Sequence, residues 1–135
     1  MDATEKITAS SPDSFVSKQH DITINGQPTH IRAQKYTNRL FVIVTQCNSF
    51  GTLLNITKEE ADVMQPDNVD VKFSVDVLVG VEEPVYKVLA RKAAALIFRD
   101  SNLPVLFSIA LKDKSKGCFA EIVDGLEKVD VWSLF

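Results

Sequence analysis

The first part of the chain carries short hydrophobic segments of the kind that form β-strands, separated by turn residues. Polar and apolar residues alternate over residues 21–24 and again over residues 29–36, on either side of an Asn25-Gly26 pair. This pair predicts a two-residue hairpin turn, because both positions tolerate a positive φ. Residues 40–46 follow as an apolar run without alternation. Such a run is typical of a central strand that is covered on both faces.

The next stretch predicts two further strands with a loop between them. Residues 52–56 form the fourth strand, and Thr57 with Glu60 has the spacing of a helix capping box. We therefore expect a short helical turn or a loop over residues 57–64. Residues 69–79 alternate strictly, which predicts a half-buried strand with one apolar face, made of Val69, Val71, Phe73, Val75, Val77 and Val79.

Two helices and one more strand are predicted in the second half. After Gly80, the acids Glu82 and Glu83 and the proline Pro84 favour a helix start, and the helix should run to about Arg99. Its apolar stripe consists of Val85, Leu89, Ala93, Leu96 and Ile97. A strand over residues 105–111, apolar on both faces, precedes a basic turn over residues 112–117. The last helix is expected over residues 118–131, with an apolar stripe of Phe119, Ile122, Val123, Leu126 and Val129.

The order β-β-β-β-loop-β-α-β-α predicts an α+β domain with a mostly antiparallel sheet of about six strands and two helices. Two helices cover about one face of such a sheet, yet residues 40–46 and 105–111 are apolar on both faces. The second face must be covered by the sheet folding over itself or by another subunit. Covering about 400 Å² of apolar surface is worth a gross ~10 kcal/mol, part of which association costs offset. We therefore expect the domain to form a dimer.

Length and composition fit one domain of 135 residues. Residues 1–17 are polar and small, so we expect a disordered N-terminal extension before a single domain over residues 18–135. No apolar run approaches the length of a membrane span, and the N-terminus lacks the features of a signal or transit peptide. The expected location is therefore cytoplasmic, possibly also nuclear. The net charge of −3 does not favour nucleic acid as a partner.

The sequence contains no constellation that predicts catalysis, a cofactor or a metal ion. Cys47 and Cys118 form no close pair, and His20 and His30 each stand alone in a predicted strand. The serine in residues 48–52 lacks the context of a nucleophile elbow, so it indicates a turn. The acids Glu59, Glu60 and Asp62 have no apolar setting that would raise a pKa. We expect no enzymatic activity, and a small enzyme with a composite active site at a dimer interface remains an alternative.

Charges are unevenly distributed along the chain. Residues 52–83 contain eight acids against two lysines, whereas residues 84–118 contain seven basic side chains against two aspartates. The two clusters are either ordinary solvated faces or separate acidic and basic docking patches that orient a protein partner. Residues 112–117 lack the glycine-rich run of a phosphate-binding loop. This basic segment is better explained as a solvated turn or a protein-docking loop than as an anion site.

Several segments, taken in order, resemble the proteasome assembly chaperone 3 family. They are residues 40–46 (LFVIVTQ), 51–53 (GTL), 77–80 (VLVG) with Glu83-Pro84, and 110–115 (ALKDKS). The resemblance extends from about Val16 to Trp132. The motif residues are expected to be structural, in turns, caps and strand ends: Thr45, Gln46, Gly51, Thr52, Gly80, Glu83 and Pro84.

The resemblance implies a function as well as a fold. Members of this family pair with a related protein, assembly chaperone 4, and the heterodimer binds α-type subunits while the α-ring of the proteasome core particle forms. Isolated members can also self-associate. For this chain we expect a docking loop made of Lys112, Asp113, Lys114 and Lys116. The alternative is a small α+β adaptor or scaffold subunit of another cytosolic complex.

Overall fold

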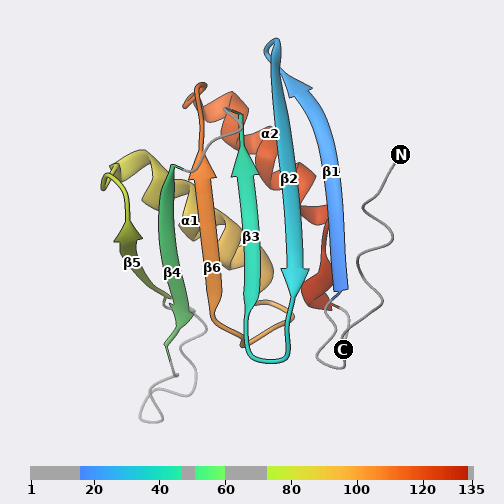
Figure 1. Ribbon diagram of the computed structural model, residues 1–135, viewed down its shortest axis with the longest axis vertical. Coiled ribbons are helices and arrows are strands. Elements are labelled where there is room, and N and C mark those ends of the chain that lie inside the picture. Colours follow the sequence, from blue (N-terminus) through green and yellow to red (C-terminus); the bar gives the residue numbers. More distant parts are fainter. Residues whose placement is uncertain (1–15, 47–50, 60–72, 134–135) are drawn as a thin grey trace.

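The computed structural model describes residues 16–46, 51–59 and 73–133, which form one sheet with two helices (Figure 1). In chain order the elements are β1 (Val16–Ile24), β2 (Gln27–Lys35), β3 (Leu40–Thr45), β4 (Thr52–Lys58), β5 (Phe73–Val79), α1 (Pro84–Ile97), β6 (Val105–Ala110), α2 (Lys116–Glu127) and a 3-10 turn (Val131–Ser133). This order is the predicted one.

The sheet contains six strands in the order β1-β2-β3-β6-β4-β5. Neighbouring strands are antiparallel except β3 and β6, which are parallel. The prediction of an α+β fold with a mostly antiparallel sheet is confirmed. The two most continuously apolar strands, β3 and β6, lie side by side in the middle of the sheet, where strands have neighbours on both edges.

Both helices lie against the same face of the sheet (Figure 1). From α1 the side chains of Leu89, Ala93 and Ile97 are buried there, and from α2 those of Ile122 and Leu126. They meet the alternate strand residues that point to this face, of which the largest fully buried ones are Ile24, Ile31, Leu40, Val42, Leu54, Ile56, Phe107 and Ile109. This helix-covered face contains the hydrophobic core.

The opposite face of the sheet, here called the open face, carries neither described helix. In β3, Leu40, Val42 and Val44 are fully buried on the helix-covered face, while Phe41, Ile43 and Thr45 point the other way and are half-buried. The register places Leu106 beside Phe41, and Leu53 of β4 follows the same alternation. Within the described chain the helices therefore cover β3 on one face only. The expected cover of its second face is supplied by neither described helix.

The first hairpin is built as the Asn-Gly pair predicts. Asn25 has φ of 50° and Gly26 has φ of 80°, so both central residues occupy the left-handed region. These are the conformations of a turn whose twist matches two right-twisted strands. The turn sets the register of β1 and β2, in which Ile24 pairs with Gln27 and His20 pairs with Ile31.

The β5 strand differs from its predicted facing. Val75 and Val77 point toward the core opposite Ile56 and Leu54, as expected. The register then shifts, and Val79 pairs with Leu53 of the open face, with 51 % of its surface exposed. The extra residue of this bulge is Leu78. Placing Val79 on the core face was wrong, because strict sequence alternation gives no sign of a bulge.

Element boundaries also shift by a few residues. Val16 and Ser17, assigned to the N-terminal extension, are the first residues of β1. Thr57, expected to cap a helical turn, continues β4. The last helix begins at Lys116 and ends at Glu127, earlier at both ends than predicted, and a separate 3-10 turn follows. The remaining expectations for residues 1–15, 47–50 and 60–72, Cys47 among them, lie outside the described residues.

Candidate functional site

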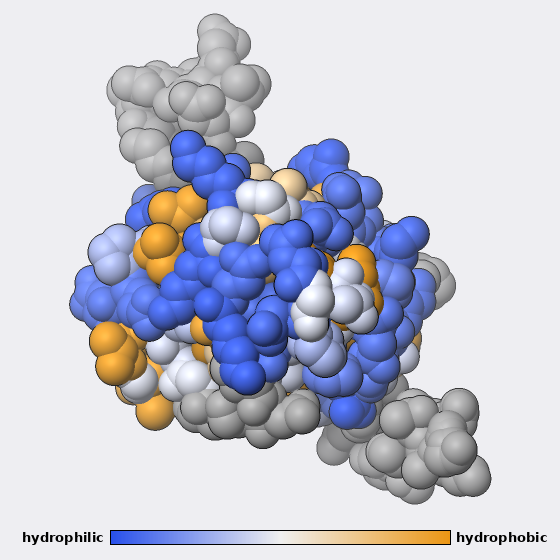
Figure 2. All heavy atoms as spheres, turned by 90° about the horizontal axis from the view of Figure 1, so that it is seen from above, coloured by the Kyte–Doolittle hydropathy of each residue, from blue (hydrophilic) through white to orange (hydrophobic). Residues whose placement is uncertain are grey.

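One end of the sheet brings together the segments that the sequence singled out. The β1–β2 turn, the end of β3, the start of β4 and the loop between β6 and α2 all lie at the upper end of Figure 1. We call residues 111–116, which are that loop and the first residue of α2, the basic loop. Figure 2 looks onto this end and shows a largely hydrophilic surface with a few hydrophobic patches.

The side chain of Gln46 binds the backbone of the basic loop. Its side-chain oxygen accepts hydrogen bonds from the backbone amides of Lys112, at 2.9 Å, and Asp113, at 2.8 Å. Its side-chain nitrogen donates to Thr29 Oγ1 at 3.1 Å and to Cys118 Sγ at 3.5 Å. Only 6 % of the residue is exposed. Because a buried amide with all these partners is costly to disturb, Gln46 fixes the loop backbone relative to β2, β3 and α2.

Asp113 is bonded within the chain. One carboxylate oxygen accepts from the Asn25 side-chain amide at 2.8 Å, and the other accepts from the Ser115 backbone amide at 3.0 Å. These bonds, the one from Asn25 first, favour the charged carboxylate and lower the pKa of Asp113 below its usual 3.8. The Ser115 hydroxyl in turn caps α2 by accepting from the Cys118 amide. Asp113 thereby ties the loop to the β1–β2 turn.

The start of α1 supports the loop from the other side. Glu83 is the residue before the helix, and Pro84 occupies its first turn. The Glu83 carboxylate forms an ion pair with Lys114 at 2.8 Å. The ammonium group of Lys114 also lies 5.3 Å from the centre of the Tyr86 ring. The Tyr86 hydroxyl accepts a hydrogen bond from the Leu111 amide at 3.1 Å, so the start of the loop is attached to α1.

The other motif residues join the start of β4 to the end of β5. Gly51 lies so close to β6 that a Cβ there would meet the Ile109 carbonyl oxygen and, at 2.9 Å, the Ala110 Cβ. Gly80 has φ of 100°, and a Cβ there would lie 2.6 Å from the Gly51 carbonyl oxygen. The Thr52 hydroxyl donates to the Val81 carbonyl at 3.0 Å. Both glycines therefore permit a backbone approach that a side chain would prevent.

The basic loop thus combines a fixed backbone with exposed charges. Lys112, Lys114 and Lys116 are solvent-exposed, while the amides and the carboxylate between them are bonded inside the domain. The predicted docking residues do lie together in one short segment. A preformed loop of this kind loses little conformational freedom when it binds another protein.

The open face offers a second candidate surface. Its centre consists of the half-buried side chains Phe41, Ile43, Leu53 and Leu106, with Ser108 and Ala110 buried between them. Beside Ile43 in the register lies Arg32, whose Nε atom is buried and has no hydrogen-bond partner in the described chain. Arg32 therefore borders the apolar centre of the open face on the side of β2.

Neither the cysteine nor the histidines of the described chain form a catalytic arrangement. Burial raises the pKa of the Cys118 thiol, which keeps it protonated and unreactive. His30 contacts the Asp21 carboxylate at 2.9 Å on an exposed stretch of the hairpin. No group of three metal-ligating side chains occurs among the described residues. No helix within these ranges is both long enough and apolar enough to cross a membrane.

Sequence reasoning missed three of the residues that build these surfaces. The sequence pattern places Asn25 in its turn alone, the predicted stripe of the first helix omits Tyr86, and Arg32 has no predicted role. Tyr86 had a detectable signal, because it lies three residues before Leu89 on the same helix face. The bond from Asn25 to Asp113 joins positions 88 residues apart, for which a single sequence holds no signal.

Comparisons with known proteins agree with the architecture. A family model described as proteasome assembly chaperone 3 matches residues 42–129. Proteasome assembly chaperone 3 of Bos taurus is 29 % identical over 121 residues, covering 87 % of this chain and 95 % of that protein. The Homo sapiens protein is 28 % identical, covering 87 % and 94 %, and the Nematostella vectensis protein is 32 % identical, covering 84 % and 88 %.

A solved structure shares the fold. It is a chain from the crystal structure of a novel chaperone complex for yeast 20S proteasome assembly, with a TM-score of 0.64 and 13 % sequence identity. The alignment covers 87 % of this chain and 98 % of that one. The matched residues run from within β3 to just beyond α2, so they include the last three strands, both helices and the basic loop but not β1 and β2. The chain therefore belongs to the proteasome assembly chaperone 3 family, whose members are chaperones and not enzymes.

Proposed function

We propose that the chain is one subunit of a chaperone dimer that promotes assembly of the α-ring of the proteasome core particle. The dimer would form with a related protein, assembly chaperone 4, and would bind α-type subunits transiently. The family match supports the general role. The observation that carries the specific proposal is the open face, where half-buried apolar side chains lie on the side of the sheet away from both helices.

The open face is the proposed dimer surface. Two such faces packed together would bury Phe41, Ile43, Leu53 and Leu106 between two sheets, with the helices on the outside. Sheets pack face to face at about 10 Å with interdigitating apolar side chains. In the absence of the related chaperone, a second copy of this chain offers the same apolar surface, so we expect a homodimer in isolation. We expect the chaperone dimer to act in the cytoplasm, with the nucleus as a second expected location.

The basic loop is the proposed contact to an α-type subunit. Lys112, Lys114 and Lys116 present their charges from a backbone that Gln46 and Asp113 hold in place. The loop lies at one end of the sheet, beside the proposed dimer surface and not within it (Figure 1). A dimer could therefore offer this loop to a ring subunit, favouring correct neighbours and blocking premature contacts. This would be a templating mechanism, in which binding is the whole activity.

Copurification from cell extract, followed by mass spectrometry, tests the proposal. The tagged chain should recover assembly chaperone 4 and α-type proteasome subunits. Reversing Lys112, Lys114 and Lys116 together to glutamate should reduce recovery of the α-type subunits and leave recovery of the related chaperone unchanged. A matched triple reversal of Arg91, Arg99 and Lys128, which are exposed elsewhere, should leave both unchanged.

Two results would contradict the proposal. Recovery of a different cytosolic complex without α-type subunits would identify the chain as another kind of adaptor. Equal recovery of α-type subunits by the wild-type chain and the loop variant, at matched salt concentration, would exclude the basic loop as the contact.

A further inference from the structure

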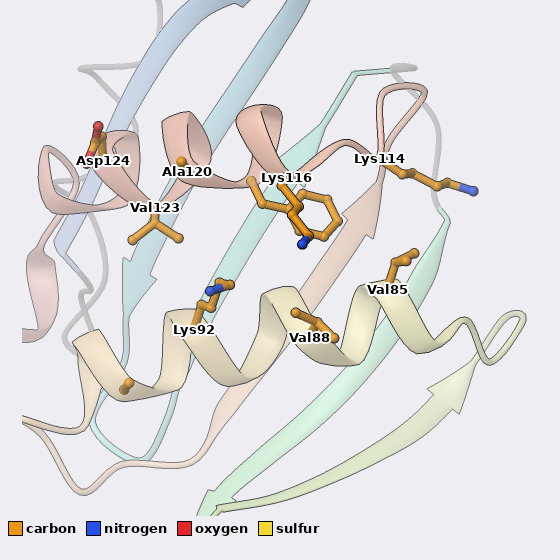
Figure 3. Close-up of a pocket in the computed structure, with 10 residues that line it drawn as sticks. Val85, Val88, Lys92, Lys114, Lys116, Ala120, Val123 and Asp124 are labelled. Carbon is orange, nitrogen blue, oxygen red and sulfur yellow. The ribbon is translucent and has the colours of Figure 1, made fainter.

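A solvent-facing groove lies between the two helices, on the side of the molecule opposite to the open face (Figure 3). Its volume is about 870 Å³. α1 contributes Val85, Val88, Lys92 and Ala95, and α2 with the basic loop contributes Lys114, Lys116, Phe119, Ala120, Val123 and Asp124. The proposed dimer surface is formed by the strands alone, so the groove would stay accessible in a dimer of that kind.

The groove has an apolar floor. Phe119 is buried at its base, Val85 and Val123 are half-buried, and Val88 has 48 % of its surface exposed. Val88 was not part of the predicted core stripe, and it is one of only five large hydrophobic residues that are well exposed in the described chain. Ala95 and Ala120 also line the groove, and their small side chains fill little of the space above this floor. An uncovered valine beside two half-buried ones favours a protein contact.

The rim of the groove is basic. Figure 3 shows Lys92 pointing from α1 toward α2 and Lys116 pointing from α2 toward α1, so the two ammonium groups lie over the floor from opposite sides. Neither forms an ion pair with any residue that the structure describes. Lys114, at the same end as Lys116, is paired with Glu83. Asp124 is the one acidic side chain in the lining.

Size and charge together specify the occupant. From Val85 to Ala95 the groove follows α1 over ten helical steps, which is roughly 15 Å at 1.5 Å per residue. This length accommodates about three turns of a helix. A helix that docks in such a groove places apolar residues at positions i, i+3, i+4 and i+7 on the floor. Carboxylates at the edges of its apolar stripe would then meet Lys92 and Lys116.

We propose that the α1–α2 groove binds an acidic amphipathic helix of a partner protein. Apolar anchors of that helix cover Val88, Val123 and the edge of Phe119, and its acidic residues pair with Lys92 and Lys116. The proposal concerns a surface other than the open face and holds whether or not the chain dimerises. It shares Lys114 and Lys116 with the basic loop, but its apolar floor lies on the two helices.

Selection of peptides on the purified chain tests this proposal without any proteasome subunit. A phage-displayed library of random 12-residue peptides is selected on the wild-type protein, and the enriched sequences are synthesised with a fluorescent label. We expect enriched peptides that combine Leu, Ile, Phe or Met at helical spacing with several Asp or Glu residues. Fluorescence anisotropy then gives their dissociation constants for the wild-type chain and its variants.

Matched variants separate the groove from general electrostatics. Lys92→Glu and Lys116→Glu should each weaken binding about two- to fivefold, and the double variant should weaken it more, because each removes an attraction and adds a repulsion at an exposed site. Val88→Gln should also weaken binding by removing the apolar contact. Arg91→Glu, on the next position of α1 but outside the groove lining, should have little effect. All four sites are exposed on helices, so the variants should fold, which circular dichroism checks.

Three outcomes would overturn the proposal. They are no enrichment of any peptide family, enrichment of neutral or basic peptides, and binding that Val88→Gln and Lys92→Glu leave unchanged. A gain of mass in sedimentation that Val88→Gln abolishes would show that a second copy of this chain occupies the groove instead. None of these results alters the copurification of α-type subunits, so failure here is distinguishable from failure of the proposed function.

Discussion

Leu53 and Leu54 are neighbours in β4 and point to opposite faces of the same sheet. Leu54 is fully buried beneath the helices, whereas Leu53 is half-buried on the open face. The same contrast holds in β6 for Phe107 and Leu106. On the helix-covered face the chain shields its own apolar residues. On the open face it places residues of the same kind where no described helix covers them. The difference teaches that the described chain completes one core by itself, whereas the open face would be completed only by the partner that we propose.

Removing the same side chain on the two faces gives the largest expected contrast. Leu54→Ala should lower the free energy of unfolding by about 2–5 kcal/mol, because it leaves a cavity in the closed core. Leu53→Ala should cost only about 1 kcal/mol in a monomer, because its side chain is already partly in water. Urea denaturation of both variants at low protein concentration measures the difference. Equal losses would mean that the open face is as closed as the other.

Substitution of Gln46 tests whether its buried side chain fixes the backbone of the basic loop. Gln46→Ala leaves the Lys112 and Asp113 amides without their acceptor and should lower the free energy of unfolding by about 1–3 kcal/mol. Hydrogen exchange should accelerate at these two amides. Gln19→Ala removes an exposed glutamine that bonds only Asp21 in the described chain and should be close to neutral. Unchanged exchange in the Gln46 variant would contradict its role as the support of the loop.

The smallest effect is the acid titration of the loop. The folded-state pKa of Asp113 is lowered by its bonds from Asn25 and Ser115, so the stability it contributes is present above about pH 3.8. This contribution is lost as the pH falls through the lower folded-state pKa. In an NMR titration the Ser115 amide and the Asn25 side-chain amide should shift together with a midpoint below 3.8. A midpoint at or above this value would show that the two bonds are absent in solution.

Local sequence patterns predicted the helices and strands and their order. They did not predict the features that depend on contacts between distant segments. The Asn25-Gly26 turn, the alternation of Phe73 to Val77 and the Glu83-Pro84 helix start each depend on residues close in sequence, and the structure confirms them. The bulge that turns Val79 outward depends on how β4 pairs with β5, which periodicity does not record.

The candidate site was harder to predict than the fold for the same reason. The sequence identified Lys112, Asp113, Lys114 and Lys116 as a possible docking loop, and the structure adds how they are held. In the sequence, Gln46 is only the last residue of an apolar run that resembles the family. Its bonds join segments 17 and 72 residues away. The groove between α1 and α2 exists only when the helices lie side by side, so no single helical stripe revealed it.

The central claim is that the open face binds another polypeptide. Sedimentation equilibrium of the purified chain and of Leu106→Lys tests it most directly, with Arg91→Glu as the charge-reversed control on α1. The account predicts twice the chain mass of 15.0 kDa for the wild type and for the control. It predicts a dissociation constant at least about 30-fold higher for Leu106→Lys, as expected when a central interface residue is lost. A folded wild-type chain that stays monomeric at high concentration, also when mixed with assembly chaperone 4, would contradict it.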